Sequence, residues 1–206
     1  MPAVSSRDTL DRMSVPAIIF AAGASRRLGQ PKQLLHVHGE TLVARNVRIA
    51  HEAGASPVFV VLGAEREDIC AALEGSGATL VDNPQWQSGL SSSVRAGVAA
   101  VEAQLQSAAG VLLMNCDQPR LDTSQLRTLL ATFKTADREA IVASSYAGVH
   151  GVPAVFPARL FTDLKTLAGD KGARSLFTRN AESLIAVSFE GGEIDIDTPD
   201  DLAHLT

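Results

Sequence analysis

"AIIFAAGASRRLGQPKQLL", residues 17–35, joins an apolar run to a loop with two glycines, two arginines and a lysine. Gly23 and Gly29 allow the backbone to approach a ligand closely, and successive free N–H groups in such a turn form an anion site. Arg27 and Lys32 add full positive charges. The stretch therefore predicts a buried strand followed by a cradle for a strongly anionic group such as a triphosphate.

The spacing of this loop separates it from two common phosphate-binding motifs. It is not a Walker A loop, because Gln30-Pro31 stands where Lys-Ser/Thr should follow. It is not GxGxxG either, since Ala-Ser-Arg follows Gly23. The alternative is a solvated loop with incidental charges, and Arg26 in particular is expected to point into water.

Short apolar runs alternate with longer helical patterns along the chain, and runs such as "VFVV" at 58–61 are continuous rather than alternating. Strands of that kind are buried on both faces. We therefore expect a three-layer α/β/α sandwich with a mostly parallel, Rossmann-like sheet, and an antiparallel strand after about residue 140. The expected strands are 17–21, 58–62, 79–81, 111–114, 140–144, 153–156, 184–188 and 193–196. The expected helices are 42–53, 66–73, 92–104, 124–134, 159–167, 171–179 and 200–204.

Length, charge and cysteine content narrow the class of protein. The 206 residues suit one domain over 15–206 after a loose extension over 1–14, which lacks the apolar core of a signal peptide. The net charge of −5 without a basic block argues against nucleic-acid binding. No apolar run approaches the roughly 18 residues of a membrane span. Two cysteines without a paired motif favour a reducing, cytoplasmic location.

Ligands of such sheets bind beyond the carboxyl ends of the strands, and "LLMNCDQPRL", residues 112–121, places Asp117 directly after an apolar run. A carboxylate there can hold Mg²⁺ against phosphate oxygens. The alternative is a cap for the helix near Ser124, but Asp117 is too distant along the chain for that role. Cys116 adjoins Asp117 without a paired histidine, so we do not expect a nucleophile.

A second pair of carboxylates lies in "EIDIDTPDDL", residues 193–202. Asp195 and Asp197 alternate on the expected strand and should point the same way. A solvated edge strand explains this pattern equally well. Together with Asp117, however, a metal shared between two strand ends is the better interpretation, with one of the two carboxylates as a second ligand and the other as its neighbour.

Two further segments follow the pattern of a substrate site. In "VDNPQWQSGLSSSVRAGV", residues 81–98, Gly89 precedes three serines that open a helix, which suits a nucleobase or ribose. The alternative is a serine-rich helix start without a ligand, and Trp86 is expected to pack. In "AGDKGARSLF", residues 168–177, a turn and a basic helix start could dock an acceptor phosphate, although a helix cap by Asp170 is equally consistent.

The loop after the first strand resembles the LAAGxSxRxGxxKxLL signature of the MobA-like nucleotidyltransferases. Later blocks resemble that family in the same order: "NPQWQSGLSSSVRAG", "NCDQP", "GVPAVF", "GDKGAR" and "DIDTPDD". The likeness covers roughly residues 15–206 and implies a sheet of the nucleotide-diphospho-sugar transferase type. The chain is most similar to the molybdenum cofactor cytidylyltransferases, the MocA-like branch, which join CMP from CTP to molybdopterin cofactor and release pyrophosphate.

The motifs also distinguish between the branches of that family. Guanylyltransferases usually begin with LAGG, whereas Ala22 precedes Gly23 here; methylerythritol phosphate cytidylyltransferases carry a DA-Arg-Pro block, whereas "DQP" follows the central strand here. The MocA-like pattern often has Gly-His-Pro where "GVP" stands at 151–153, a departure that concerns the acceptor more than the nucleotide. The resemblance thus implies CTP as the favoured nucleotide and molybdopterin as the phosphorylated acceptor, with a molybdoenzyme or its maturation chaperone as a further partner.

By resemblance, the acceptor phosphate attacks the α-phosphorus in line, Mg²⁺ is held by Asp117 and Asp197, and Arg27 and Lys32 neutralise the growing charge. The implied catalytic residues are Arg27, Lys32 and Asp117. The implied nucleotide-binding residues are Ala21, Ala22, Gly23, Ala24, Ser25, Gly63, Asn83, Gly89 and Ser93. The residues expected on the acceptor side are His150, Asp170, Lys171 and Arg174.

Other functions stay open from the sequence. A guanylyltransferase and a methylerythritol phosphate cytidylyltransferase-like enzyme are alternatives within the family. A nucleotide-binding module without turnover is less consistent with the presence of both Asp117 and Asp197. A nicotinamide-dependent oxidoreductase on a similar sheet would be expected to carry GxGxxG, which is absent here.

Overall fold

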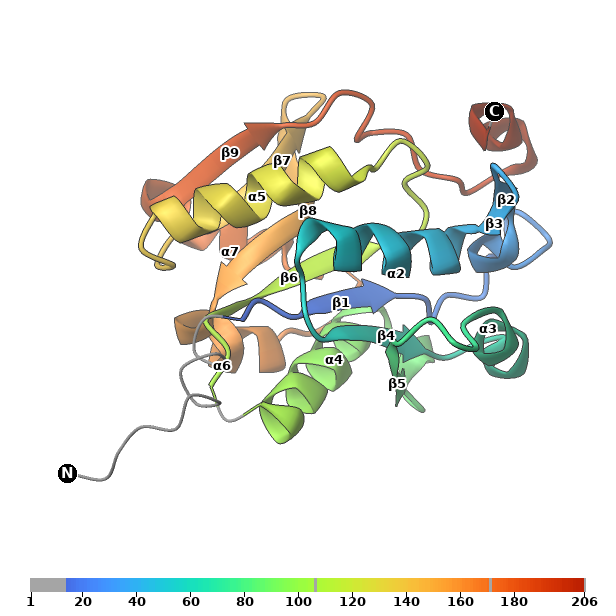
Figure 1. The fold of residues 1–206 in the computed structure, drawn as a ribbon, viewed down its shortest axis with the longest axis horizontal. Helices are drawn as coiled ribbons and strands as arrows, with labels where there is room; N and C mark the ends of the chain where they lie inside the picture. The colour runs from blue at the N-terminus through green and yellow to red at the C-terminus, as the bar shows by residue number, and fades with distance from the viewer. Residues whose placement is uncertain (1–13, 106, 171, 206) are drawn as a thin grey trace.

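A seven-stranded sheet forms the middle layer of the protein (Figure 1). The computed structural model describes residues 14–105, 107–170 and 172–205. The strands, in the order in which they lie across the sheet, are β5 (Thr79–Asp82), β4 (Val58–Leu62), β1 (Ala17–Phe20), β6 (Gly110–Asn115), β8 (Val149–Pro157), β7 (Ile141–Tyr146) and β9 (Leu184–Ser188). Only β8 runs antiparallel to its neighbours. This confirms the mostly parallel sheet and its late antiparallel strand.

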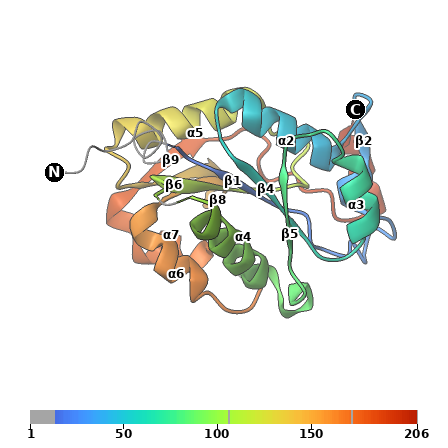
Figure 2. The ribbon, with the colours of Figure 1, turned by 60° about the horizontal axis from the view of Figure 1, so that its bottom comes forward.

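Helices cover both faces of the sheet (Figure 2). One face carries α2 (Leu42–Ala53) and α5 (Thr123–Thr135); the other carries α4 (Leu90–Gln104), α6 (Phe161–Lys165) and α7 (Arg174–Arg179). A third helix, α3 (Arg66–Ala72), lies on the same face as α2 and α5, near the edge strand β5. Short 3-10 segments are η1 (Lys32–Leu34), η2 (Trp86–Ser88), η3 (Ala158–Leu160), η4 (Ala181–Ser183) and η5 (Pro199–Leu205). The expected three-layer sandwich is confirmed.

The hydrophobic core is divided between the two faces of the sheet. Successive residues of a strand point to opposite faces, so Ile19 of β1 packs with the residues under α2 and α5, while Ile18 packs with those under α4. All residues of β1 and β4 are buried. Burial on both faces explains why these strands are continuous apolar runs.

Two expected elements at the end of the chain are wrong. Residues 193–196 form no strand, because the chain turns at 191–193, where the N–H of Ile194 donates to the carbonyl oxygen of Gly191 at 3.2 Å, and the segment pairs with none of the described strands. Its backbone contacts the loop after β6 through the N–H of Ile196, which donates to the carbonyl oxygen of Asp117 at 3.0 Å. The expected helix over 200–204 is instead the 3-10 segment η5.

Other boundaries differ in ways that the local sequence explains. A small hairpin of β2 (His36–Val37) and β3 (Glu40–Thr41) was not expected, because strands of two residues have no detectable period. The expected helix over 159–167 is divided between η3 and α6, and the helix expected over 171–179 begins at Arg174. Residue 171 and the expected extension up to residue 13 lie outside the described residues. No helix in the described ranges is long and apolar enough to cross a membrane.

Candidate active site

A cavity of about 390 Å³ opens beyond the carboxyl end of β1. It is built from three segments that are distant in sequence: the loop after β1, the turn that leads into α4, and the loop before α7. The lining residues are Ala22, Gly23, Ala24, Ser25, Arg26, Trp86, Gln87, Gly89, Leu90, Ser93 and Asp170. Six of the nine predicted nucleotide-binding residues therefore line one cavity. Ala21 lies fully buried at its base, with its N–H donating to the carbonyl of Val61 at 3.0 Å.

The loop after β1 turns back on itself over residues 25–29. Ser25 has a φ of 48° and Gly29 a φ of 77°, and the carbonyl of Ser25 accepts the N–H groups of Leu28 at 3.1 Å and Gly29 at 3.2 Å. The N–H of Lys32 then donates to Ser25 Oγ at 3.1 Å. The sequence prediction of a compact turn that carries cations is consistent with this geometry. Arg26 is exposed, as expected, although it also borders the cavity.

Four predicted charged residues meet at this loop. Lys32 Nζ lies 2.5 Å from Asp117 Oδ2 and 2.8 Å from Asp197 Oδ1, and Arg27 Nη2 lies 2.7 Å from Asp197 Oδ2. Lys32 and Asp117 expose only 15% and 13% of their side chains, so solvent screens this pair weakly. The tertiary fold thus joins residues more than 80 positions apart into one electrostatic unit.

Charge and burial act against each other on these groups. Burial disfavours the ammonium of Lys32, but the charge of Asp117 and the hydrogen bonds to both carboxylates outweigh it and raise the pKa of Lys32. Burial alone would raise the pKa of Asp197; the hydrogen bond and charge of Lys32, with help from Arg27, lower it instead. Burial, followed by the charge of Asp117, raises the pKa of Asp195 to about 7. Lys32 and Asp197 are therefore ionised at neutral pH.

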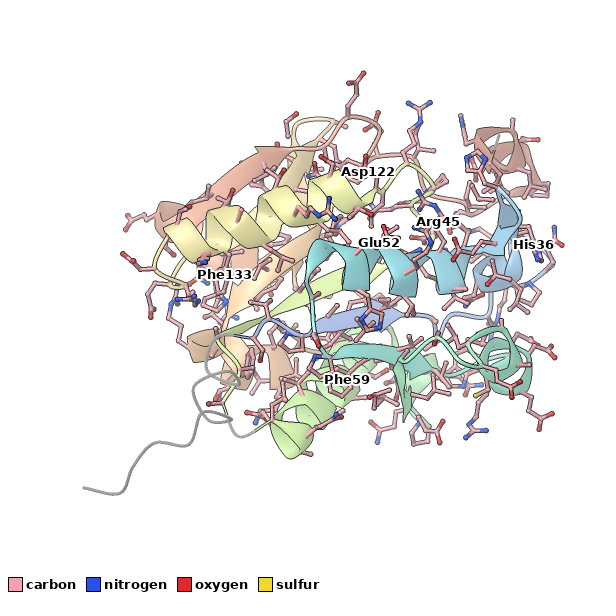
Figure 3. The ribbon with its side chains drawn as sticks, in the orientation of Figure 1. His36, Arg45, Glu52, Phe59, Asp122 and Phe133 are labelled. Atoms are coloured by element: carbon pink, nitrogen blue, oxygen red, sulfur yellow. The ribbon has the colours of Figure 1, made fainter. Side chains whose placement is uncertain are left out.

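Helix α2 holds the loop that carries Asp117. Arg45 Nη2 donates to the carbonyl of Leu121 at 2.6 Å, and Asn46 Nδ2 donates weakly to the carbonyl of Cys116 at 3.4 Å. Figure 3 shows Arg45 and Glu52 along α2, with Asp122 at the start of the neighbouring α5. The Asp122 side chain caps α5 by accepting the N–H of Gln125 at 2.8 Å. The carboxylate of Asp117 therefore comes from a loop that is fixed at both ends.

The arrangement fits a divalent cation whose coordination shell is completed by phosphate oxygens of a ligand. Asp117 Oδ1 is buried and has no hydrogen-bond partner among the described residues, and the position of Lys32 Nζ shows that one cation can reach both carboxylates. The described part of the chain holds no group of three His, Cys, Asp or Glu side chains able to bind a metal by itself. Mg²⁺ commonly takes only one or two protein carboxylates together with substrate phosphates and water, so Asp117 and Asp197 suffice.

Two predicted nucleotide contacts lie elsewhere. Asn83 is buried, and its side-chain amide donates to Ser92 Oγ at 2.8 Å and Ser93 Oγ at 3.1 Å. Its Oδ1 accepts the N–H of Gln85 at 3.0 Å. Because these bonds use its polar atoms, Asn83 shapes the start of α4 rather than lining the first cavity. The sequence shows that residue 83 has a polar amide, but it does not show which groups this amide bonds.

Gly63 is the other predicted nucleotide contact that lies outside the first cavity. A Cβ there would lie 2.7 Å from the carbonyl oxygen of Ala22 and from Trp86, so only glycine fits. Gly63 and Asn83 line a second cavity of about 420 Å³, and Trp86 lines both cavities. The two predicted residues therefore support the indole that walls the first cavity.

The expected acceptor residues are not brought together as one group. Asp170 borders the first cavity against Gly89, and the loop before it docks on α4 through a bond from the N–H of Ser91 to the carbonyl of Gly169 at 3.2 Å. Arg174 and His150 are exposed at the starts of α7 and β8. Lys171 lies outside the described residues.

Two buried glutamines were missed by sequence reasoning. Gln118 donates to the carbonyls of Val152 at 3.2 Å and Gly192 at 2.8 Å, which ties the loop after β6 to two later segments. Gln33 bonds backbone atoms of the loop after β1. Both stand beside predicted charged residues, but their partners are set by tertiary structure. Cys116 is fully buried, which raises its pKa to about 12 and agrees with its exclusion as a nucleophile.

Comparison with known proteins identifies relatives over nearly the whole chain. The profile of the MobA-like NTP transferase domain matches residues 17–184. The chain is 32% identical over 204 residues to the nicotine blue oxidoreductase of Paenarthrobacter nicotinovorans, covering 95% of this chain and 98% of the relative. It is also 32% identical over 198 residues to the purine catabolism protein PucB of Bacillus subtilis, covering 89% and 92%.

The expected cytidylyltransferase likeness is more distant. The molybdenum cofactor cytidylyltransferase of Escherichia coli is 26% identical over 196 residues, covering 91% of this chain and 93% of the relative. Among solved structures, Rv0371c from Mycobacterium tuberculosis has a TM-score of 0.79 at 30% identity, covering 94% and 98%. Its complex with manganese has a TM-score of 0.71 at 27% identity, covering 93% and 97%.

Proposed function

The chain belongs to the MobA-like NTP transferase family, and we propose that it transfers CMP from CTP to a small phosphorylated acceptor, molybdopterin, with release of pyrophosphate. The observation that carries this proposal is the unit of Lys32, Asp117 and Asp197 beside the cavity at the end of β1. Charged groups of this kind neutralise the charge that develops in phosphoryl transfer, and the GxGxxG loop expected of a nicotinamide-dependent oxidoreductase is absent from the sequence.

The positions of these groups support an in-line transfer. An oxygen of the acceptor phosphate attacks the α-phosphorus, and the bond from that phosphorus to the pyrophosphate oxygen breaks. The loop over residues 22–25 would hold the triphosphate through its N–H groups. Lys32 and Arg27 would neutralise the charge that grows on the departing pyrophosphate. No protein nucleophile is needed, and the buried thiol of Cys116 is unsuited to be one.

Asp117 and Asp197 would hold the divalent cation, which supplies Lewis-acid stabilisation of the phosphate oxygens when bound. The manganese complex of Rv0371C supports a divalent cation in a protein of this fold. With their carboxylates engaged in this way, Lys32 would turn its ammonium from them to phosphate oxygens. The short distances from Nζ to both carboxylates place it within reach of that exchange.

Two features support CTP as the nucleotide. Ala22, which stands where the guanylyltransferases usually have glycine, lines the cavity itself. The "DQP" block at 117–119 follows β6 and includes the buried Gln118. The likeness to the molybdenum cofactor cytidylyltransferase of Escherichia coli over 196 residues supports molybdopterin as the acceptor.

Steady-state pyrophosphate release tests the proposal. CTP, GTP, ATP and UTP are compared with Mg²⁺, with and without molybdopterin. We expect the largest kcat/KM for CTP, dependence on the acceptor, and loss of turnover in Asp117→Ala with the fold retained. A preference for GTP would assign the chain to the guanylyltransferases, and near-wild-type turnover in Asp117→Ala would contradict the metal site.

A redox assay is the second arm, because one relative is named nicotine blue oxidoreductase. Reduction of nicotine blue by NADH or NADPH is followed in the wild type and in Asp117→Ala. We expect no reduction above the protein-free rate. Robust reduction that Asp117→Ala leaves intact, without pyrophosphate release from any nucleotide, would replace the proposed transferase by an oxidoreductase.

A further inference from the structure

Gln33 is an uncharged, buried side chain directly behind the loop that lines the first cavity. Only 1% of its surface is exposed. Its Nε2 donates to the carbonyl oxygens of Ala21 at 2.9 Å and Gly23 at 2.7 Å, and its Oε1 lies 3.4 Å from Ser25 Oγ. One amide therefore contacts three residues of the loop.

These bonds determine the direction of the loop's N–H groups. In a trans peptide unit the carbonyl and the next N–H point to opposite sides. Since Gln33 holds the carbonyls of Ala21 and Gly23, the N–H groups of Ala22 and Ala24 point away from it. The carbonyl of Ala22 is held separately by the N–H of Ala64 at 3.1 Å.

The N–H groups that result are free for a ligand. Within the described chain, no hydrogen bond is donated by the N–H groups of residues 22–24, although all three residues line the cavity. Adjacent N–H groups without carbonyl partners, facing a cavity, form an anion-binding concavity. The carbonyl oxygens that would repel an anion are turned to the opposite side.

Glutamine suits this position better than other residues of its size. It offers two donors on one nitrogen without a charge, so burying it does not require a counter-ion. Glutamate could not donate to two carbonyls, and methionine would fill the space but leave both carbonyls unpaired. Gln33 also follows Lys32 directly, and the N–H of Lys32 bonds Ser25 Oγ. The same short segment therefore shapes the loop and carries the ammonium.

We propose that Gln33 is a positioning residue that holds the loop over residues 21–25 in its anion-binding conformation. The proposal rests on the proposed function only in taking the anion to be the triphosphate of the nucleotide. Gln33 does not touch the ligand; it acts through the peptide units that it orients.

Binding of inorganic tripolyphosphate in EDTA tests this role without the metal, the base or turnover. Calorimetric titration is followed in parallel with fluorescence of Trp86, the only tryptophan, which lines the same cavity. We expect the Kd to rise about tenfold in Gln33→Met, the loss of roughly one charge-assisted hydrogen bond. The matched control is Gln125→Met, which removes an amide that bonds Ser144 instead and should bind as the wild type does.

Binding within twofold of wild type in a folded Gln33→Met protein would overturn the proposal, as would a wild type that binds no tripolyphosphate. If Gln33→Met does not fold, Ser25→Ala decides, because Ser25 is only partly buried and its Oγ links Gln33 to Lys32. We expect its Kd to rise severalfold; because the bonds of Gln33 to Ala21 and Gly23 persist in that variant, Gln33→Asn, whose shorter amide cannot hold both carbonyls, completes the test, and unchanged binding in both variants would overturn the proposal. A wild type that binds tripolyphosphate but releases no pyrophosphate would refute the proposed function alone.

Discussion

At the scale of single residues, the ammonium of Lys32 replaces solvent as the partner of two carboxylates. It is held between Asp117 and Asp197, and Arg27 pairs with Asp197 from the solvent side. Two positive and two negative charges therefore offset one another before any ligand binds. A triphosphate with a divalent cation brings opposite charges to the same place, so each partner of this network can be exchanged without leaving a buried charge unpaired.

Removing the ammonium should affect the transition state more than binding. We expect Lys32→Ala to lower kcat by about two orders of magnitude, as loss of one preorganised donor typically does, with a smaller change in KM. Arg26→Ala is the control, since that side chain is exposed. Steady-state kinetics with CTP and thermal melting check both variants. Equal, mild effects would mean that the charges of the loop serve only as solvated surface.

At the scale of elements, α4 lies so close to the sheet that a glycine is required at the contact. A Cβ at Gly97 would lie 2.6 Å from Cγ2 of Ile18 and 3.2 Å from Cγ2 of Val61. Both are fully buried β-branched side chains with little freedom to move. The same helix begins with Gly89 and Ser93 at the cavity. Packing in its middle therefore sets the position of its ligand-facing end.

Gly97→Ala should lower the stability of the protein. Alanine gains about 1 kcal/mol of helix propensity, whereas overpacking a rigid core costs about 1–3 kcal/mol, so we expect a net loss of about 1 kcal/mol. Ala99→Gly, at an exposed position of the same helix, measures the propensity difference by itself. Urea unfolding gives both values. A Gly97→Ala protein more stable than wild type would show that the contact relaxes freely.

At the scale of the whole molecule, two distant loops bring three carboxylates together at one end of the sheet. The pKa of Asp195 rises to about 7 through burial and the charge of Asp117, while that of Asp197 is lowered by Lys32. The two pKa shifts make the free energy of unfolding change with pH in opposite directions. The raised pKa of Asp195 favours the folded state at low pH, and this contribution is lost as pH rises toward 7. The lowered pKa of Asp197 favours it above about pH 4.

Asp195→Asn should therefore stabilise the metal-free protein more at pH 8 than at pH 5. At pH 5 the wild-type carboxyl is neutral in the folded state, so the substitution changes the stability less there than at pH 8. Asp195 is exposed, and solvent screening reduces the size of the effect. Melting temperatures in EDTA at the two pH values provide the measurement. An equal difference between variant and wild type at both pH values would contradict the raised pKa.

Several features of this molecule were predictable because their signal is local. The continuous apolar runs of β1 and β4 indicated strands buried on both faces, and the loop after β1, predicted from its glycines and cations to approach a ligand, lines a cavity. Asp117 was placed correctly, since a carboxylate directly after a buried strand must emerge at the edge of the sheet. Residue order and hydrophobic period carry this information without reference to distant parts of the chain.

Tertiary structure decided what depends on partners far along the chain. The strand expected over 193–196 failed because the chain turns at 191–193 and the segment pairs with none of the described strands, and Asp197 reaches Lys32 from a loop instead. Asn83 was predicted as a nucleotide contact and Gln33 was missed, because only folding brings to their amides the hydroxyl and backbone groups that they bond. Sequence by itself determined the layers and the end of the sheet at which the cavity opens, because burial acts residue by residue. Which polar atoms line the cavity was decided by tertiary structure, because a hydrogen bond depends on the position of both partners.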